Sequence, residues 1–436
     1  IEVAENLRWY YSAPGRKVNE YDLGSLYNLL GLLYEAQNKP KKAEKYCLAA
    51  IEIRERLVEK NADAYEPALA GSYNNAGNLY KKQGQSQKAE KYLLAAMEIY
   101  ERLVKENADA YEPDLAGSYN NAGNFYKDQG QPEKAEKYYL TAIEIRERLV
   151  KKNAEAYEPD LAGSYNNAGI FYAKQNQPEK AEKYYSDAIE IYERLVKKNV
   201  DAHEPALATS YYNAVSFYYE QGRLEKSEKY ILAAMEIYER LAKKNADAYE
   251  PALAGSYSAA GVFYHKQGQS GKAEKYYLAA IEIYERLVEK NADAYEPNLA
   301  GSYNNAGVFY YEQGRLEKSE KYILAAIEIR ERLAKKNANA FEPDLAMSYN
   351  NAGEFYANQD YLEKSEKYYL AAIEIYERLV KENAAAYEPD LADSYFNYYL
   401  LKKDKTYLDK AYEIAKRRQD DPRCGKLMKD IESMLK

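Results

Sequence analysis

Apolar and polar residues alternate along this chain with the period of amphipathic helices, and residues 113–158 illustrate the pattern. Apolar side chains recur there at three- and four-residue steps, at Leu115, Tyr119, Ala122 and Tyr126. That spacing places them on one face of a helix. Pro113 suits a first helical turn, where its missing N–H costs nothing. We therefore expect a helix that begins near Pro113 and ends before Gly130, a residue type that tolerates the left-handed conformation of a helix end.

A second helix follows and is expected to run from about Pro132 to Lys152. Its apolar residues also share one face: Ala135, Tyr139, Ala142, Ile145 and Leu149. At ~1.5 Å per residue this helix is roughly 30 Å long. We expect Asn153 to close it and the following Tyr-Glu-Pro segment to form a loop. The two segments together predict an antiparallel helical hairpin.

The hairpin pattern returns at a constant interval of 46 residues. The dipeptide Glu-Pro marks the interval, with its proline at positions 67, 113, 159, 205, 251, 297, 343 and 389. A fixed period of this length is the signature of a solenoid, in which each repeat buries its apolar face only against its neighbours. We expect function in such an array to lie along an extended surface.

The repeat register divides the chain into three parts. Residues 22–389 are expected to hold eight repeats, and residues 390–436 a degenerate ninth repeat with a capping helix over the open apolar end. Residues 1–11 align with the tail of a second helix, so we expect residues 1–21 to hold an N-terminal cap or the remnant of a preceding helix. The chain opens with Ile1 and shows no signal-peptide pattern, which predicts a fragment or a processed product.

The repeated positions resemble the tetratricopeptide repeat family. The residues that carry the resemblance in the third repeat are Tyr119, Ala122, Gly123, Tyr126, Ala135, Tyr139 and Ala142. The standard unit of that family has about 34 residues. Here the second helix continues past Glu147, which is similar to the longer units of kinesin light chains and of bacterial signalling proteins with such arrays. The resemblance implies an all-α, right-handed superhelical solenoid of antiparallel helix hairpins.

Composition limits the partners and the compartment. Charged residues make up 30% of the chain with both signs interspersed, and the net charge of −8 gives no electrostatic footprint for nucleic acid or anionic lipid. No stretch approaches the ~20 apolar residues of a membrane span. Two cysteines, Cys47 and Cys424, provide no disulfide framework. We therefore expect a cytoplasmic protein with no nucleic-acid partner and no membrane insertion.

Few residues are arranged for chemistry. His203 and His265 are the only histidines, and neither has a second histidine or cysteine at ligand spacing, so we expect no metal site. No glycine-rich loop follows a strand, so a phosphate-bearing cofactor has no support. Glu144 and Arg148 are expected to form an ion pair within one exposed helix face. The sequence predicts no enzyme activity and no cofactor.

Asparagine recurs at two adjacent positions of the first helix, although it is a mediocre residue inside a helix. The first position holds Asn28, Asn74, Asn120, Asn166, Asn304 and Asn350, and the second holds Asn75, Asn121, Asn167, Asn213, Asn305, Asn351 and Asn397. In the tetratricopeptide family the first helix lines the concave surface. There, asparagines of O-GlcNAc transferase and of kinesin light chains hold an extended peptide, since an amide both donates and accepts. The resemblance implies the same contact here; duplication without selection and bridging between neighbouring helices are the alternatives.

The same resemblance places further side chains in this groove. Besides the asparagines from Asn74 to Asn351, the predicted peptide-binding residues are Asn78, Asn124, Lys81, Lys127 and Lys174. Basic groove residues gather in repeats two to four and acidic ones in repeats five to eight, a polarity suited to orienting a bound peptide.

The predicted function is a non-catalytic scaffold that binds an extended peptide segment of another protein in the concave groove. The alternative is a sensor or oligomerisation arm of a larger signalling protein, whose upstream nucleotide-switch or effector domain is missing from this chain. A third reading is an accessory domain of an enzyme. The sequence leaves the oligomeric state open.

Overall fold

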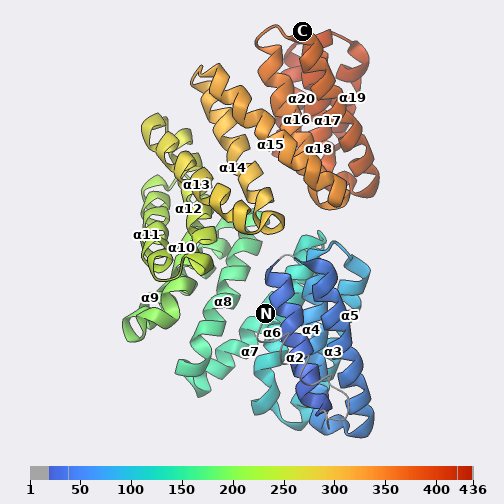
Figure 1. Cartoon of the computed structure of the whole chain (residues 1–436), viewed down its shortest axis with the longest axis vertical. Coiled ribbons are helices and arrows are strands. Elements are labelled where there is room, and N and C mark those ends of the chain that lie inside the picture. The colour runs from blue at the N-terminus through green and yellow to red at the C-terminus, as the bar shows by residue number, and fades with distance from the viewer. Residues whose placement is uncertain (1–18, 38, 420, 435–436) are drawn as a thin grey trace. The chain divides into compact units, whose positions relative to one another are not determined.

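The computed structural model describes residues 19–37, 39–419 and 421–434, and every regular element in these residues is an α-helix (Figure 1). The predicted N-terminal cap or helix remnant lies, apart from residues 19–21, outside the described residues. The helices are α2 (Glu20–Ala36), α3 (Pro40–Lys60), α4 (Ala62–Lys82), α5 (Ser86–Glu106), α6 (Ala108–Asp128), α7 (Pro132–Lys152), α8 (Ala154–Lys174), α9 (Pro178–Lys198), α10 (Val200–Glu220), α11 (Leu224–Lys244), α12 (Ala246–Lys266), α13 (Ser270–Lys290), α14 (Ala292–Glu312), α15 (Leu316–Lys336), α16 (Ala338–Ala357), α17 (Leu362–Glu382), α18 (Ala384–Lys402), α19 (Lys405–Arg417) and α20 (Pro422–Met434).

Consecutive helices pair into hairpins. Each even-numbered helix from α2 to α18, called helix A below, is followed by an odd-numbered helix B. Helix B also packs against the helix A of the next repeat, as α7 does against α8. The prediction of an all-α solenoid of antiparallel hairpins is confirmed, and the handedness of its superhelix stays a prediction.

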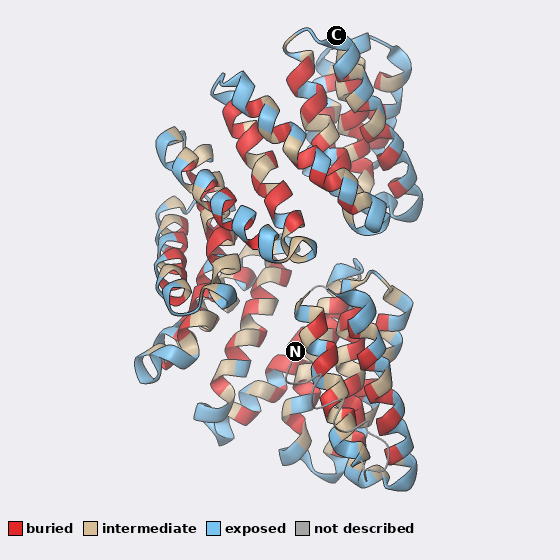
Figure 2. Ribbon diagram, in the orientation of Figure 1, coloured by how far each residue is buried: buried red, intermediate tan, exposed pale blue. Residues whose placement is uncertain are grey.

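The array divides within α12 into two compact units, Ile1–Ser256 and Tyr257–Lys436. In each unit, buried residues line the contacts between helices, and exposed residues cover the hairpin ends (Figure 2). At the end of the second unit, α20 packs against α18 and α19. An amphipathic helix therefore stands where the sequence predicts a cap.

The predicted apolar stripes form the interior of each hairpin. Ala122, Ala135 and Ala142 have no exposed surface, and Tyr139 keeps only 1%. Gly123 allows the two helices to approach closely, because a Cβ atom there would lie 2.7 Å from Cδ1 of Tyr139. The buried faces predicted from the sequence are thus confirmed.

The connection between repeats is shorter than predicted. Asn153 is the only residue between α7 and α8: its N–H donates to the carbonyl of Leu149 (2.9 Å), and its side chain accepts from the N–H of Ala156 (3.2 Å). The expectation that helix A begins near the proline was wrong, because an asparagine cap already starts it five residues earlier. Pro159 lies inside α8, where it removes one helical hydrogen bond near the first turns.

The glutamate of each Glu-Pro pair lies within helix A rather than in a loop, and it is buried in six of the eight pairs. Glu112 is 6% exposed, and its carboxylate lies 2.6 Å from a guanidinium nitrogen of Arg148. The expected Glu144–Arg148 pair is therefore replaced by a pair between α7 and α6. Equivalent pairs join Glu66 to Arg102, Glu158 to Arg194, Glu204 to Arg240, Glu296 to Arg332 and Glu342 to Arg378.

The turn between helices A and B is as predicted. Gly130 follows α6 with a φ of 66°, and the glycines at 84, 222, 268 and 314 also have positive φ. Asn176 (φ 53°) and Asp360 (φ 61°) take the same conformation at the equivalent positions. Asparagine and aspartate are the side chains that tolerate this region best after glycine.

Candidate functional site

An open pocket of about 260 Å³ lies on the helix A face of the first unit. Helices α2, α4 and α6 contribute its lining residues: Leu32, Glu35, Asn75, Asn78, Lys81, Lys82 and Asn121. The structure thus brings four of the predicted site residues together on one accessible surface. The mixture of amides and charged groups is suited to polar contacts with a peptide rather than to burial of an apolar ligand.

Lysines dominate the charge around this pocket. Lys81 lies 3.0 Å from Asp128, and Lys82 lies 2.5 Å from Glu35. Burial lowers the pKa of Lys127, and the positive charges of Lys174 and Lys81 act in the same direction against the attraction of Asp128. The helix A face of α4 to α8 is therefore basic, with two carboxylates that partly neutralise it.

The corresponding face of the second unit has a different charge. His265 on α12 lies 2.9 Å from Glu312 on α14, between Nε2 and Oε2. Burial and the charge of Glu312 raise the pKa of Glu354 on α16. Glu312 and Glu354 thus make the surroundings of α14 and α16 acidic, and the polarity of a whole groove stays a prediction.

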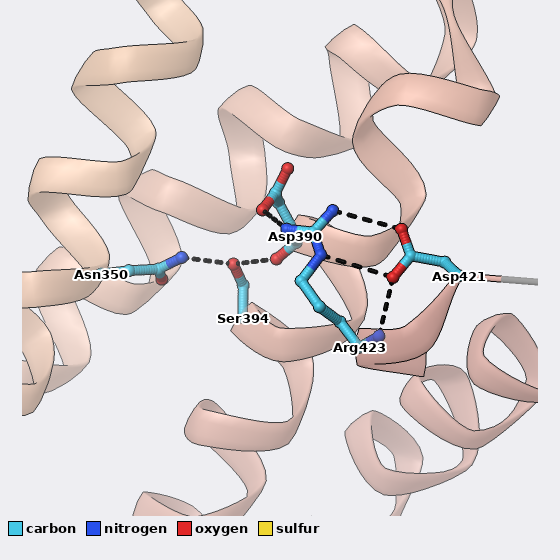
Figure 3. Close-up of polar contacts among 5 residues, drawn as sticks. All are labelled: Asn350, Asp390, Ser394, Asp421 and Arg423. Carbon is cyan, nitrogen blue, oxygen red and sulfur yellow. Dashed lines mark hydrogen bonds and ion pairs between the residues drawn. The ribbon is translucent and has the colours of Figure 1, made fainter. Parts of the chain in front are cut away.

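The first asparagine position, which we call the inner position, joins neighbouring helices A. In three repeats the inner amide nitrogen donates to a serine hydroxyl of the next helix A: Asn74 to Ser118 (2.6 Å), Asn166 to Ser210 (2.5 Å) and Asn350 to Ser394 (2.7 Å). Figure 3 shows the last of these contacts. In three others the inner amide oxygen accepts from the next repeat: Asn28 from Asn75 (3.1 Å), Asn120 from Asn167 (3.2 Å) and Asn304 from Asn351 (3.0 Å). The inner asparagines therefore form the helix bridges that the sequence leaves open as an alternative.

The second position, which we call the outer position, is half-buried in every repeat where it is asparagine. Outer asparagines fall into two groups. Asn75, Asn167 and Asn351 use their amide nitrogen in the bridges above. Asn121, Asn213, Asn305 and Asn397 make no side-chain hydrogen bond within the described part of the chain. Their amides are therefore the outer amides that the described fold itself does not use, and of these Asn121 lines the pocket.

The remaining predicted site residues are placed less favourably. Asn124 accepts a hydrogen bond from the hydroxyl of Tyr139 (2.8 Å), so its carbonyl oxygen is partly committed to the hairpin. Lys174 is exposed at the end of α8 and is not among the residues that line the pocket, although its charge acts on Lys127.

Sequence reasoning missed the serines beneath the asparagines. Serine occupies positions 72, 118, 164, 210, 256, 302, 348 and 394, and all eight are buried. A polar residue that recurs on a buried face needs a hydrogen-bond partner. The need of these eight serines for hydrogen-bond partners is therefore the sequence signal that would have indicated the helix bridges.

Neither a metal centre nor a membrane span is found in the described residues. Within residues 19–37, 39–419 and 421–434, no three His, Cys, Asp or Glu side chains gather to hold an ion. In the same residues no helix is long and apolar enough to cross a bilayer. Cys47 is buried, and burial is the main reason that its pKa is raised to about 12.

Comparison with protein families gives a direct result. Two tetratricopeptide repeat profiles match residues 22–102, 114–194, 206–286, 299–337 and 345–383. A search of curated proteins gives no significant match.

Solved structures with a similar fold are distant in sequence. One is a signal transduction ATPase with numerous domains (STAND) from Pyrococcus horikoshii, which carries a tetratricopeptide repeat sensor; it is 16% identical, with a TM-score of 0.51 over 98% of this chain and 66% of that one. Another is aspartyl phosphate phosphatase F from Bacillus subtilis, at 17% identity and a TM-score of 0.50 over 92% and 96% of the two chains. A putative kinesin light chain from Podosopora anserina is 14% identical, with a TM-score of 0.40 over 52% of this chain and all of that one. At these identities the likeness concerns the fold alone.

Proposed function

Because this chain belongs to the tetratricopeptide repeat family, we propose that it is a non-catalytic scaffold whose helix A face binds an extended peptide segment of a partner protein. In the first unit the proposed contacts are the outer asparagines with Asn78, Lys81 and Lys127. The equivalent face of the second unit carries Asn305 and Asn351. The observation that carries the proposal is the pocket on α2, α4 and α6, whose lining includes the uncommitted amide of Asn121.

Hydrogen-bond chemistry supports the choice of a peptide. An amide side chain can donate to a backbone carbonyl and accept from a backbone N–H at once. Asn121 and Asn213 lie two repeats apart on the same face of the first unit and have no partner in the described chain. An extended peptide presents donors and acceptors at regular intervals, so it can satisfy amides repeated along a solenoid.

The alternative is that the array is a sensor or oligomerisation arm of a larger signalling protein. The STAND protein carries a tetratricopeptide repeat region that is described as its sensor. That resemblance concerns the fold, and a sensor arm would itself need a ligand on one face. The two hypotheses therefore share the binding experiment and differ in what the bound ligand controls.

Selection from a random peptide display library on the immobilised chain tests the proposal. We expect it to enrich peptides that bind the helix A face of the first unit. Asn121→Ala should weaken a selected peptide by about 2- to 13-fold, the range that corresponds to roughly 0.5–1.5 kcal/mol for one hydrogen bond. Glu144→Gln is the matched control, because Glu144 is exposed on helix B, away from the pocket. Peptides whose affinity drops with Glu144→Gln and not with Asn121→Ala would show that the proposed face is wrong.

A further inference from the structure

At one equivalent position of helix B, each of the eight repeats has either arginine or tyrosine. Arginine stands at positions 54, 146 and 330, and tyrosine at 100, 192, 238, 284 and 376. Arg54 and Arg330 are only 7% and 5% exposed, and Arg146 is partly buried. None of the three forms an ion pair within the described chain, and burial lowers the pKa of each. A buried cation without a carboxylate partner is costly, so its contacts need an explanation.

Each arginine occupies two acceptors on the next helix A. Arg146 Nη1 donates to the carbonyl oxygen of Asp160 (2.9 Å) and to Oγ of Ser164. Arg54 makes the same contacts with the carbonyl of Ala68 (2.7 Å) and Ser72 (2.5 Å). Arg330 makes them with the carbonyl of Asp344 (2.9 Å) and with Ser348. In each case the carbonyl lies four residues before the serine, so it is the acceptor that a helical serine would otherwise use.

Tyrosine leaves these acceptors free. The hydroxyls of Tyr100 and Tyr192 donate to the carbonyls of Pro67 (3.2 Å) and Pro159 (2.9 Å), in helix A of their own repeats. The serine of the next helix A then donates to its own helix: Ser118 to Asp114 (3.0 Å), Ser210 to Ala206 (2.9 Å) and Ser394 to Asp390 (2.7 Å). Figure 3 shows this arrangement at Ser394, which also accepts from Asn350.

The direction of the serine hydrogen bond determines which amide group of the inner asparagine the serine contacts. After two of the three arginines, Arg54 and Arg330, the serine hydroxyls of Ser72 and Ser348 donate to the amide oxygens of Asn28 and Asn304 (3.4 Å each). Where tyrosine is present, the serine accepts instead, and the inner asparagine donates its nitrogen. The amide oxygens of Asn74, Asn166 and Asn350 are then buried, with no hydrogen-bond partner among the residues that the structure describes.

The outer asparagine of the next repeat follows the inner one. After the three arginines, Asn75, Asn167 and Asn351 each donate to an inner amide oxygen. After Tyr100, Tyr192 and Tyr376, the outer residues Asn121, Asn213 and Asn397 make no side-chain hydrogen bond in the described chain. The agreement holds in all six pairs of neighbouring repeats in which the first has an inner asparagine and the second an outer asparagine.

We propose that the arginine or tyrosine of helix B sets the hydrogen-bond polarity of the groove. After arginine, one of the two N–H donors of the outer asparagine is tied to the inner amide oxygen, so the ligand meets its oxygen, which fits a backbone N–H, and only one remaining N–H. After tyrosine, the outer asparagine presents a whole amide, which fits a donor and an acceptor together. Arg54, Arg146 and Arg330 are thus positioning residues that never touch the ligand. We call the series of contacts from the helix B residue through the serine and the inner asparagine to the outer asparagine the relay. The statement about the ligand rests on the proposed function, whereas the relay does not.

Exchange of asparagine side-chain amide protons with water tests the relay without any ligand. The full chain would be labelled with ¹⁵N-asparagine, and each signal assigned through single Asn→Ala variants. In Arg146→Tyr, which copies the residue found at 100 and 192, the Asn167 protons should exchange about fivefold faster, as expected for loss of one hydrogen bond. In Tyr100→Arg, the Asn121 protons should exchange about fivefold more slowly. Unchanged rates at Asn167 and Asn121 in these two variants would overturn the inference.

Two controls separate the relay from a general loss of stability. Tyr192→Phe removes a hydroxyl without supplying donors to Ser210, so the Asn213 protons should keep their exchange rate. In Arg146→Tyr, the rate at Asn213 should also stay as it is, because faster exchange at every asparagine would mean local unfolding and count against the relay. If the relay holds and no peptide binds, the proposed function is wrong while the positioning role of the arginines stands.

Discussion

Repeats three and four, α6–α7 and α8–α9, share their packing and differ beneath the groove. In both, a glycine of helix A lies against a tyrosine of helix B: Gly123 against Tyr139 and Gly169 against Tyr185. The difference is Arg146 in repeat three and Tyr192 in repeat four, and with it the direction of the polar contacts to the next helix A. The two repeats thus share the positions whose packing builds the solenoid. They differ at one buried position of helix B, and this position changes which polar groups are available at the surface.

The largest effect is expected from breaking the shared packing. Gly123→Leu and Gly169→Leu should each destabilise the array by about 1–3 kcal/mol, because even a Cβ atom would lie 2.7 Å and 2.9 Å from the tyrosine rings. Urea unfolding of both variants measures this. Gly117→Ala is the control, because the nearest heavy atom to a Cβ there is 4.0 Å away. Similar losses at both glycines are expected; a loss in only one repeat would show that the two hairpins do not share their packing.

A pH-dependent effect of comparable size is expected at Asp393, which stands where repeats three and four have Gly117 and Gly163. Burial raises the pKa of Asp393 to about 6, with Arg423 opposing the shift and Asp390 and Asp421 adding to it. The folded state therefore binds this proton more tightly than the unfolded state. Its stabilising effect is full below about pH 4 and is lost as the pH rises through about 6.

Asp393→Asn should remove this dependence. At about pH 8 the variant should protect α18 to α20 from hydrogen exchange more than the wild type does, by roughly 1–3 kcal/mol, and at about pH 4 the two should match. Hydrogen exchange of these helices measured at both pH values checks the sign. A variant that is less stable than the wild type at pH 8 would mean that the ionised carboxylate and Arg423 stabilise the cap.

Much of the fold could be predicted from the sequence because the same residue pattern recurs in every repeat. The apolar stripe of Ala122, Ala135 and Ala142 and the left-handed position at Gly130 are local features, and both are found where the pattern puts them. The start of helix A was missed because proline is a familiar first-turn residue. In the structure Asn153 both ends α7 and caps α8. No loop is needed between the two helices, and α8 therefore starts before its proline.

The candidate site is harder to read from sequence. The asparagine columns are plain, but the partner of each amide depends on residues from three helices. Asn75, for example, donates to Asn28 on α2, which also accepts from Ser72, the serine that Arg54 of α3 contacts. Asn28 and Asn75 are 47 positions apart, and only the packing of neighbouring hairpins brings the residues of this group together.

The smallest effect on stability should distinguish the two groups of outer asparagines. Asn75→Ala with Asn167→Ala removes two helix bridges. Each lost hydrogen bond should reduce the free energy of unfolding by about 1 kcal/mol, so the melting temperature should fall. Asn121→Ala with Asn213→Ala removes no bridge, so the melting temperature should stay the same or rise slightly, since alanine favours the helix. Equal losses in both pairs would show that the uncommitted amides are structural after all.

The affinity of the Asn121→Ala, Asn213→Ala double variant for a library-selected peptide tests the central claim most directly. Calorimetric titration should show binding weakened by about 5- to 150-fold relative to the wild type, the range for two lost hydrogen bonds, with the melting temperature unchanged. Unchanged affinity in a folded double variant would contradict the account, because it would mean that the free amides of the groove do not hold the ligand.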